Sequence, residues 1–191
     1  IYMSKNWMPN IWSWDNCFNA FGVEEKDPEL AYNQMKIFVE YQDESGAYPD
    51  FINTQFASYN CVKPPIHAWA YEKLMEKNAY FTDENRLKEM YKSLSHSTRY
   101  WVNYRREGEK GLCYYTHGND SGWDNASIFH EGLAVIAPDL QGYLIQQMDT
   151  LARWARKLNR VSDAVFWEGE SEQFYQLLLT ELYDEKKEQF V

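Results

Sequence analysis

Apolar side chains recur every three or four residues in five stretches of the chain, the spacing that places them on one face of an α-helix. These stretches cover residues 27–42, 66–74, 82–106, 140–158 and 162–182. The strict alternation of apolar and polar residues that is typical of strands is scarce. The pattern therefore predicts an all-α fold.

Residues that favour helix starts support these assignments. Pro28 and Pro65 each stand near a first turn, where the amide hydrogen that proline lacks would have no partner in the helix. Thr82 and Asn85 form an imperfect capping box, and Ser162 is the expected N-cap of the last helix. We expect each helix to begin at or just after these residues.

Two long segments without helical periodicity, residues 43–63 and 107–136, join some of these helices, whereas the other connections are short. Loops of this length inside a compact domain are usually functional, and these two are rich in Gly, Asn, Trp and Tyr. The layout predicts helical hairpins with the long loops at one end. The 191 residues suit one domain, so we expect residues 1–191 to form a single unit.

Composition excludes several classes of protein. The net charge of -10 and the dispersed basic residues make nucleic acid an unlikely partner, and no apolar run approaches the roughly 20 residues of a membrane helix. Cys17, Cys61 and Cys113 are too far apart for a zinc spacing and odd in number, so we expect buried free thiols. No leader sequence is evident at the start, and we expect a cytoplasmic protein.

The aromatic content is unusual, with 8 Trp, 15 Tyr and 10 Phe. Several of the tryptophans stand beside Gly, Asp and Asn in the segments without helical periodicity. Aromatic faces combined with carboxylates and amides suit carbohydrates, whose rings offer apolar C–H faces and polar rims. Composition thus favours a carbohydrate partner.

One segment offers a candidate catalytic acid. Asp120 and Asp124 flank Ser121-Gly122-Trp123, and Gly122 permits a backbone conformation that could aim Asp124 into a cavity beside an indole. A carboxyl group next to an apolar ring loses hydration, which raises its pKa, as a general acid near neutral pH requires. The alternative is an Asx-type turn with no chemical role.

Other segments add candidate binding residues. Trp12 and Trp14 both precede Asp15, which puts two indoles beside a carboxylate, while Asp50 and Lys63 lie in the first long loop. Each has a structural alternative, which is core packing for Trp14, a turn for Asp50 and a solvated charge for Lys63.

Taken in order, these segments resemble the catalytic toroid of glycoside hydrolase family 63 and its trehalase-like relatives. The resemblance spans roughly residues 8 to 145, and the Ser-Gly-x-Asp motif within residues 119–126 is its most specific element. It implies that the fold is about half of an (α/α) six-hairpin toroid with long functional loops. It also assigns the general acid to Asp124. Trp14, Asp15, Asp50, Lys63 and Gly122 match positions that line the sugar pocket of the family, and we expect Tyr48 and Trp123 to bind the sugar as well.

The sequence departs from the family at three positions. The family often has Glu where Asp120 stands, and relatives often have Gln in place of Lys63 and Asn in place of Asp50. These departures leave the reaction in place and put the identity of the sugar in question.

The resemblance implies an inverting reaction, which needs a second carboxylate about 6.5–9.5 Å from the acid to activate water. The family supplies it from a later hairpin, and the candidates in this chain, Asp15, Asp50, Glu44 and Glu131, fit that role poorly. A six-hairpin toroid has twelve helices, and this sequence predicts five or six. We therefore expect an incomplete catalytic domain that is inactive alone and that self-associates through its open edge.

These inferences lead to one primary function and two alternatives. The primary function is an exo-acting, inverting α-glycosidase, and specifically an α-glucosidase of small oligosaccharides or glycosides. One alternative is a trehalase or an α-rhamnosidase-like toroid enzyme, and the other is a noncatalytic carbohydrate-binding protein built on helical repeats. We expect neither a cofactor nor a metal, because His67, His96, His117 and His130 lack ligand spacing.

Overall fold

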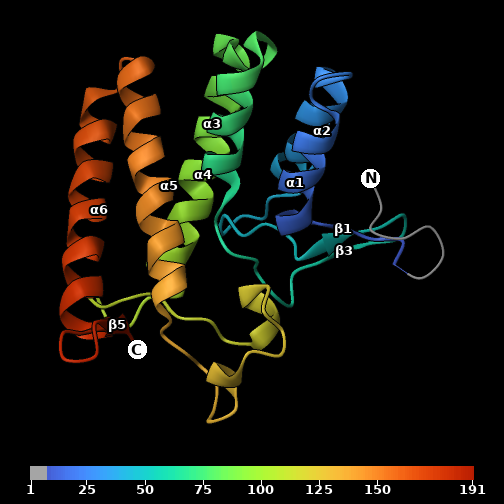
Figure 1. Ribbon diagram of the computed structural model, residues 1–191. Coiled ribbons are helices and arrows are strands. Elements are labelled where there is room, and N and C mark those ends of the chain that lie inside the picture. Colours follow the sequence, from blue (N-terminus) through green and yellow to red (C-terminus); the bar gives the residue numbers. More distant parts are fainter. Residues whose placement is uncertain (1–7) are drawn as a thin grey trace.

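Three helical hairpins stand side by side in the structure, a computed structural model that describes residues 8–191 (Figure 1). Residues 1–7 of the expected domain lie outside this range. The helices are α1 (Ser13–Val23), α2 (Pro28–Glu40), α3 (His67–Lys77), α4 (Glu84–Tyr104), α5 (Pro138–Lys157) and α6 (Val161–Leu182). The prediction of an all-α fold is confirmed.

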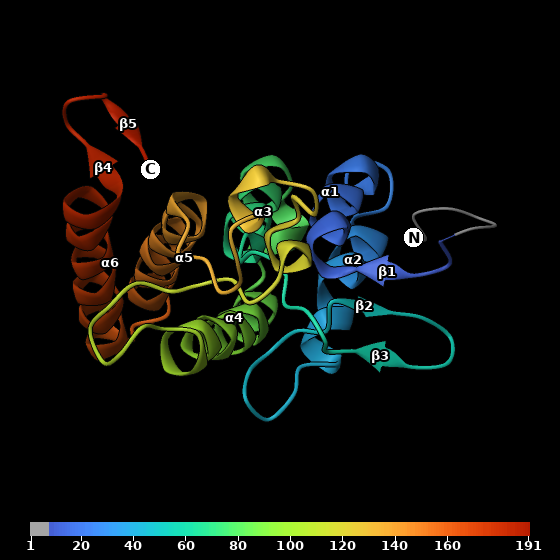
Figure 2. The ribbon, with the colours of Figure 1, turned by 90° about the horizontal axis from the view of Figure 1, so that it is seen from below.

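Both long loops lie at the same end of the hairpins. Short turns join α1 to α2 and α5 to α6, and the 3-10 helix η1 (Ala79–Thr82) lies between α3 and α4. The segments that connect one hairpin to the next run below the helices in Figure 1. Figure 2, viewed from that end, shows the hairpins following one another across the molecule, with α3 in contact with both α1 and α5.

Two helix starts differ from the prediction. The N-cap of α4 is Asp83, whose Oδ1 accepts hydrogen bonds from the amides of Asn85 (3.1 Å) and Arg86 (3.0 Å), and Thr82 ends η1 instead. Helix α6 begins at Val161, so Ser162 lies inside its first turn and is not the cap.

Helix α1 was not predicted. Its buried residues are Ser13, Asn16, Cys17 and Ala20, which are small or polar and hide the helical period. Asn16 compensates for its burial by donating a hydrogen bond to the carbonyl of Gln34 on α2 (3.0 Å). The helix therefore packs through close contact of small side chains.

A small sheet stands beside the start of α1. Strands β1 (Ile11–Trp12), β2 (Phe51–Ile52) and β3 (Ala57–Ser58) are antiparallel, with Trp12 opposite Phe51. The amide of Ser13 donates to the carbonyl of Asp50 across 3.1 Å. This pairing brings the first long loop against the start of α1.

The core lies between the helix layers and includes large aromatic side chains. Trp101, Tyr71, Phe38 and Trp167 are almost fully buried. The three cysteines are buried free thiols, as predicted. Over residues 8–191, none of the helices is long and apolar enough to cross a membrane.

Candidate active site

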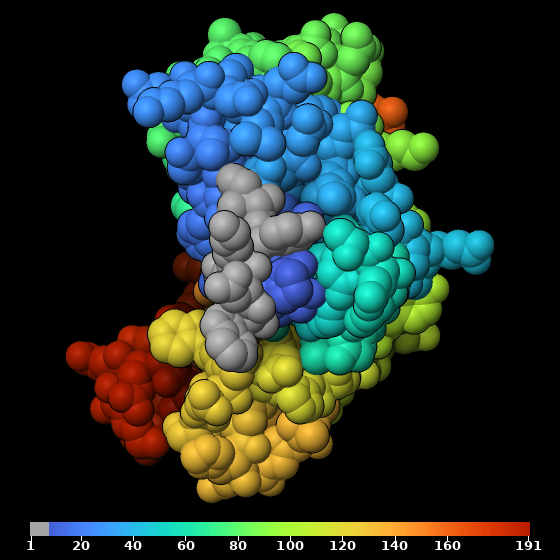
Figure 3. Space-filling model, turned by 90° about the vertical axis from the view of Figure 1, so that its right-hand side faces the viewer, coloured from blue at the N-terminus to red at the C-terminus, as the bar shows by residue number. Residues whose placement is uncertain are grey.

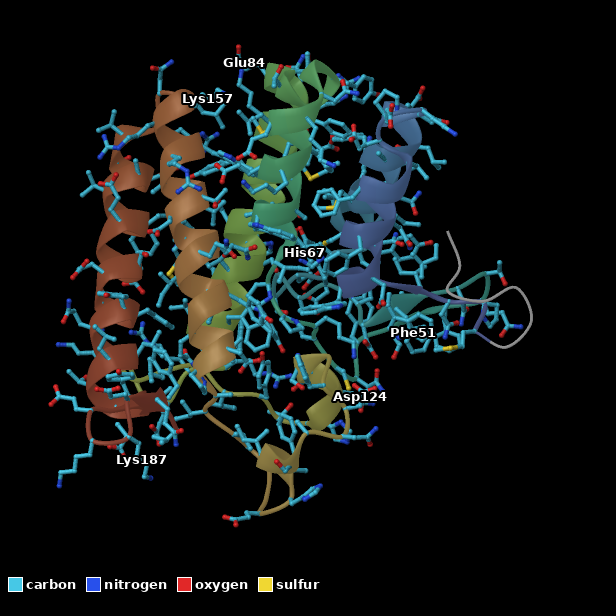
Figure 4. All side chains as sticks on the ribbon, in the orientation of Figure 1. Phe51, His67, Glu84, Asp124, Lys157 and Lys187 are labelled. Carbon is cyan, nitrogen blue, oxygen red and sulfur yellow. The ribbon has the colours of Figure 1, made fainter. Side chains whose placement is uncertain are left out.

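A cleft of about 420 Å³ opens at the loop end of the hairpins. Figure 4 marks Asp124 on the second long loop and Phe51 on the small sheet, both at this end, whereas Glu84 and Lys157 mark the opposite end. In Figure 3 the segments in blue, cyan and yellow meet on the side of the molecule that faces the viewer. The cleft is lined by Met8, Trp12, Trp14, Asp15, Asp50, Phe51, Asn60, Lys63, Asn119, Gly122 and Asp124.

Three carboxylates from three segments line the cleft. Asp15 lies in the first turn of α1, Asp50 precedes β2, and Asp124 follows η2 (Gly118–Ser121). Burial raises the pKa of Asp15, and the charge of Asp124 raises it further, while Lys63 acts in the opposite direction. Burial likewise raises the pKa of Asp50 against the effect of Lys63. Acidic groups separated in sequence thus act on one another across a single cleft.

Lys63 connects two walls of the cleft. Its ammonium nitrogen lies 3.4 Å from Oδ1 of Asp50, and both side chains are at least nine-tenths buried. The same nitrogen donates a hydrogen bond to the carbonyl of Asn119. Lys63 is therefore neither a solvated charge nor free in the cleft, because it balances Asp50 and contacts the loop that carries Asp124.

Asp120 is a structural residue. Its Oδ1 accepts from the amide of Val62 (3.1 Å), and its Oδ2 accepts from the amides of Thr116 (2.8 Å) and His117 (3.2 Å) and lies 3.2 Å from a guanidinium nitrogen of Arg105. The side chain is fully buried. Of the two carboxylates in the motif, only Asp124 faces the cleft.

Gly122 gives the motif its turn. It has φ 73° and ψ -4°, in the left-handed region that side chains disfavour, and it ends η2. A Cβ atom built there would lie 3.7 Å from the indole of Trp14, which is ordinary contact. Glycine is thus required by conformation rather than by space.

Trp123 and Asp124 are both exposed within the described residues. Trp123 has 66% of its surface accessible and lies outside the cleft lining. The expectation that an adjacent indole would shield the Asp124 carboxyl is therefore not met by these residues. Trp14 is the predicted indole that lines the cleft beside the acid.

Tyr48 lies in the core and does not line the cleft. It is 4% exposed, its hydroxyl is 2.7 Å from Oγ of Ser93, and its ring packs 5.0 Å from the imidazole of His67. The structure thus does not bring Tyr48 to the cleft with the other predicted residues, because its side chain is turned towards α4. The sequence alone does not show whether an aromatic side chain in a loop points into the core or into a cleft.

Five cleft residues, among them Met8 at the start of the described range, were absent from the predicted set. Trp12 stands two positions before Trp14, and Asn119 opens the motif, so both lay in segments that the sequence had singled out. Phe51 and Asn60 come from the small sheet and the segment after it, and no pattern marked them. Within residues 8–191, no group of three or more His, Cys, Asp or Glu could hold a metal ion.

Comparison with known proteins identifies the family to which the chain belongs. The family described as "Mannosylglycerate hydrolase MGH1-like glycoside hydrolase domain" matches residues 8–191. The protein named Uncharacterized protein YMR196W from Saccharomyces cerevisiae is 28% identical over 148 residues, a match that covers 66% of this chain and 13% of the yeast protein.

Solved structures from Thermus thermophilus have the same fold. An uncharacterized conserved protein aligns with a TM-score of 0.84 at 18% identity. The alignment covers 96% of this chain and 59% of the Thermus protein. A family 63 mannosylglycerate hydrolase in complex with glucose aligns with a TM-score of 0.80 at 18% identity. This alignment covers 96% of this chain and 59% of the hydrolase. The complex of this hydrolase with Tris and D-glycerate aligns with a TM-score of 0.79, and the alignment covers 94% of this chain and 60% of the hydrolase. The predicted partial toroid is confirmed, and this chain spans about three fifths of those structures.

Proposed function

Because the chain belongs to the MGH1-like family of glycoside hydrolases and has the family 63 type of fold, we propose that it carries the acid and sugar pocket of an exo-acting, inverting α-glycosidase. The observation that carries the proposal is the convergence of Asp15, Asp50 and Asp124 with Trp14 on one cleft. The indole can pack on the apolar face of a sugar ring, and the carboxylates can accept hydrogen bonds from its hydroxyl groups.

Asp124 donates the proton. As the glycosidic C–O bond breaks, its carboxyl proton passes to the departing oxygen, so that the leaving group departs as an alcohol. A second carboxylate takes a proton from water, and the oxygen of that water bonds to the anomeric carbon from the opposite face. Asp124 lines the cleft and is exposed, so a leaving group in the cleft has access to its carboxyl.

The second carboxylate belongs to a part of the toroid outside these residues. Of the other carboxylates in the cleft, Asp50 is balanced by Lys63, and Asp15 interacts with both Lys63 and Asp124. We assign Asp15 and Asp50 to hydrogen bonds with sugar hydroxyls. The chain spans 59% of the aligned Thermus structure, which leaves room for the base in the remainder.

The sugar is a hexose, and α-glucosides are the first substrates to test. The complexes of the Thermus hydrolase with glucose and with D-glycerate support a hexose bound beside a small hydroxylated leaving group. The ion pair of Lys63 with Asp50 determines which donors and acceptors the sugar hydroxyls meet on this side of the cleft. A panel of α-linked disaccharides separates an α-glucosidase from a trehalase or an α-rhamnosidase-like enzyme.

The decisive experiment is Asp124→Asn in the longest natural form of the protein. We expect turnover to fall by roughly 10²–10⁴-fold with sugar binding retained, the range that general acid catalysis supplies. NMR of the first-formed anomer tests inversion. A parent protein that binds sugar without any turnover would instead support the noncatalytic carbohydrate-binding function. The isolated 191-residue chain is expected to be inactive.

The proposal includes self-association of the 191-residue chain. Helix α6 packs on α5 and exposes Val161, Val165, Tyr175 and Leu179. Apolar side chains on an exposed helix face favour burial against a second surface. A second copy of the chain is the occupant available when the domain is prepared alone.

A further inference from the structure

Two neighbouring arginines follow helix α4 and contact different parts of the molecule. The side chain of Arg105 is 13% exposed, and its Nη1 lies 3.2 Å from Oδ2 of Asp120. The side chain of Arg106 is 7% exposed, and its Nη1 lies 3.4 Å from Oε2 of Glu170 on α6. The described lining of the cleft includes neither arginine. Arg105 therefore contacts the motif that carries the acid from outside the cleft, whereas Arg106 contacts the last hairpin.

The guanidinium group of Arg105 joins three partners. Its Nε donates a hydrogen bond to the hydroxyl of Tyr100 across 2.9 Å. Its Nη1 donates to Oγ1 of Thr116 across 2.5 Å and to Oδ2 of Asp120. Tyr100 belongs to α4 and Arg105 is the C-cap of that helix, whereas the other two partners lie in the second long loop. A planar guanidinium with several fixed donors can hold all three in one geometry, which the single nitrogen of a lysine cannot.

Asp120 extends this support to the turn around it. Its Oδ2 also accepts hydrogen bonds from the amides of Thr116 and His117 and from the hydroxyl of Thr116 (2.9 Å). Asp120 is itself part of the short 3-10 helix η2 (Gly118–Ser121). Arg105 and Asp120 together thus attach η2 to the end of α4.

The backbone of Asp124 lies directly against η2. A Cβ atom built on Gly118 would come within 2.9 Å of the carbonyl oxygen of Asp124, which is too close for a real contact. The hydroxyl oxygen of Ser121 accepts a hydrogen bond from the amide of Trp123 across 3.0 Å. A shift of η2 therefore displaces the acid. A misplacement of about 1 Å in a catalytic group can lower the rate by roughly 10²-fold.

We propose that Arg105 is a positioning residue for the general acid: it holds Asp120, Asp120 holds η2, and η2 places the carboxyl of Asp124 in the cleft. The inference rests on the proposed function, in which Asp124 protonates the leaving group. Without the guanidinium group, Asp120 would be a buried carboxylate that has lost its cation, which is costly for the folded loop. The loop would shift to expose that carboxylate to water, and Asp124 would move with it.

Substrates with different leaving groups test this role. The oxygen that leaves a disaccharide needs a proton, whereas the fluoride of α-glucosyl fluoride needs little help from an acid. In the longest natural form of the protein, Arg105→Ala should lower kcat by roughly 10²-fold on the α-linked disaccharide that the wild type hydrolyses fastest, with little change in KM. On the fluoride, kcat should fall by less than about tenfold. Equal losses of kcat on the two substrates overturn the proposal.

Arg106→Ala is the matched control. Arg106 is the neighbouring residue, is buried to a similar extent and also belongs to an ion pair. We expect this variant to lose stability but to keep the wild-type ratio of kcat between the two substrates. If it changes that ratio as much as Arg105→Ala does, the proposal is overturned.

Arg105→Lys is the second variant, for the case in which Arg105→Ala does not fold. It keeps the positive charge and loses the fixed donors, so kcat on the disaccharide should fall by about tenfold. A change of several-fold in the ratio of kcat between disaccharide and fluoride supports the proposal. A ratio equal to that of the wild type overturns it.

Crystal structures of the wild type and the variants separate this inference from the proposed function. If the wild type hydrolyses neither substrate, the hydrolase function fails. A displacement of Asp124 by about 1 Å or more in Arg105→Ala, without one in Arg106→Ala, then still supports the positioning role. If the wild type is active and Asp124 keeps its place in Arg105→Ala, the function stands and the positioning proposal fails.

Discussion

The ammonium nitrogen of Lys63 lies 3.4 Å from Oδ1 of Asp50, and within residues 8–191 this carboxylate oxygen has no hydrogen-bond partner. The pair is a charge interaction between two side chains that are at least nine-tenths buried. Removing one member of a buried pair leaves an uncompensated charge, whereas replacing both by amides leaves none. A pair of neutral amides at these two positions would therefore leave no uncompensated buried charge.

We predict a recovery when both charges are removed. Lys63→Gln alone should lower the free energy of unfolding by about 3 kcal/mol, because Asp50 stays charged and buried. Adding Asp50→Asn should restore much of that loss. Urea unfolding of the single and double variants measures both values. A double variant no more stable than Lys63→Gln would contradict the charge argument.

Substitution of Asp120 should lower the free energy of unfolding more than substitution of an exposed polar residue. Asp120→Asn places an NH₂ group against amide donors in either orientation, since Val62 donates to one oxygen and Thr116 and His117 donate to the other. We expect a loss of about 3 kcal/mol in chemical denaturation. Glu84→Gln is the control, because it removes an exposed pair with Lys88 that is worth only about 0.3–0.5 kcal/mol.

The elements that sequence predicted are those whose burial follows a helical period. The helix predicted over residues 27–42 is α2, and the fourth stripe is α5. Helix α1 was missed because its buried face consists of small and polar residues, whose burial depends on contact with α2. Local pattern could not supply that tertiary information.

The candidate site was predicted in part for the same reason. The motif marked Gly122 and Asp124, but it could not say that Asp120 would turn inward to accept amides from a loop about 60 residues earlier. The sequence could not show that Tyr48 points into the core, because its orientation depends on a contact with Ser93 on α4. Long-range contacts decide which residues of a marked segment line the cleft.

Substitution of two glycines should have opposite effects. Gly122→Ala should lower stability by about 1–2 kcal/mol, because φ there is 73°. Gly169→Ala, in α6 with open space around it, should raise stability by about 0.5–1 kcal/mol. Gly122→Asn should lose less than Gly122→Ala, because Asn tolerates the left-handed region. Thermal melts of the three variants check the order, and equal losses at both glycines would contradict it.

The 191-residue chain should associate through α6. Light scattering at micromolar concentration is expected to give a mass above the 22.8 kDa monomer. Val165→Asp should shift the mass towards the monomer, because it puts a charge on the exposed apolar face. Thr180→Asp, an exposed polar position on the same helix, is the control. A monomer in the parent chain would contradict the proposal.

His67 should make the fold sensitive to acid. Burial lowers the pKa of its imidazole from 6.5 to about 4. Between these values the unfolded chain binds a proton that the folded chain does not, so stability is complete above pH 6.5 and falls as the pH approaches 4. The shift corresponds to about 3 kcal/mol.

The comparison with His67→Gln isolates this effect. The raised pKa values of Asp15, Asp50 and Asp139 act in the opposite direction, because the folded state then binds protons more readily than the unfolded state. They remain in the variant, so the difference in unfolding free energy between wild type and His67→Gln should change in favour of the variant from pH 7 to pH 4. His130→Gln, at an exposed loop position, should leave the wild-type profile unchanged. If the two substitutions give parallel profiles, the buried imidazole does not cause the acid sensitivity.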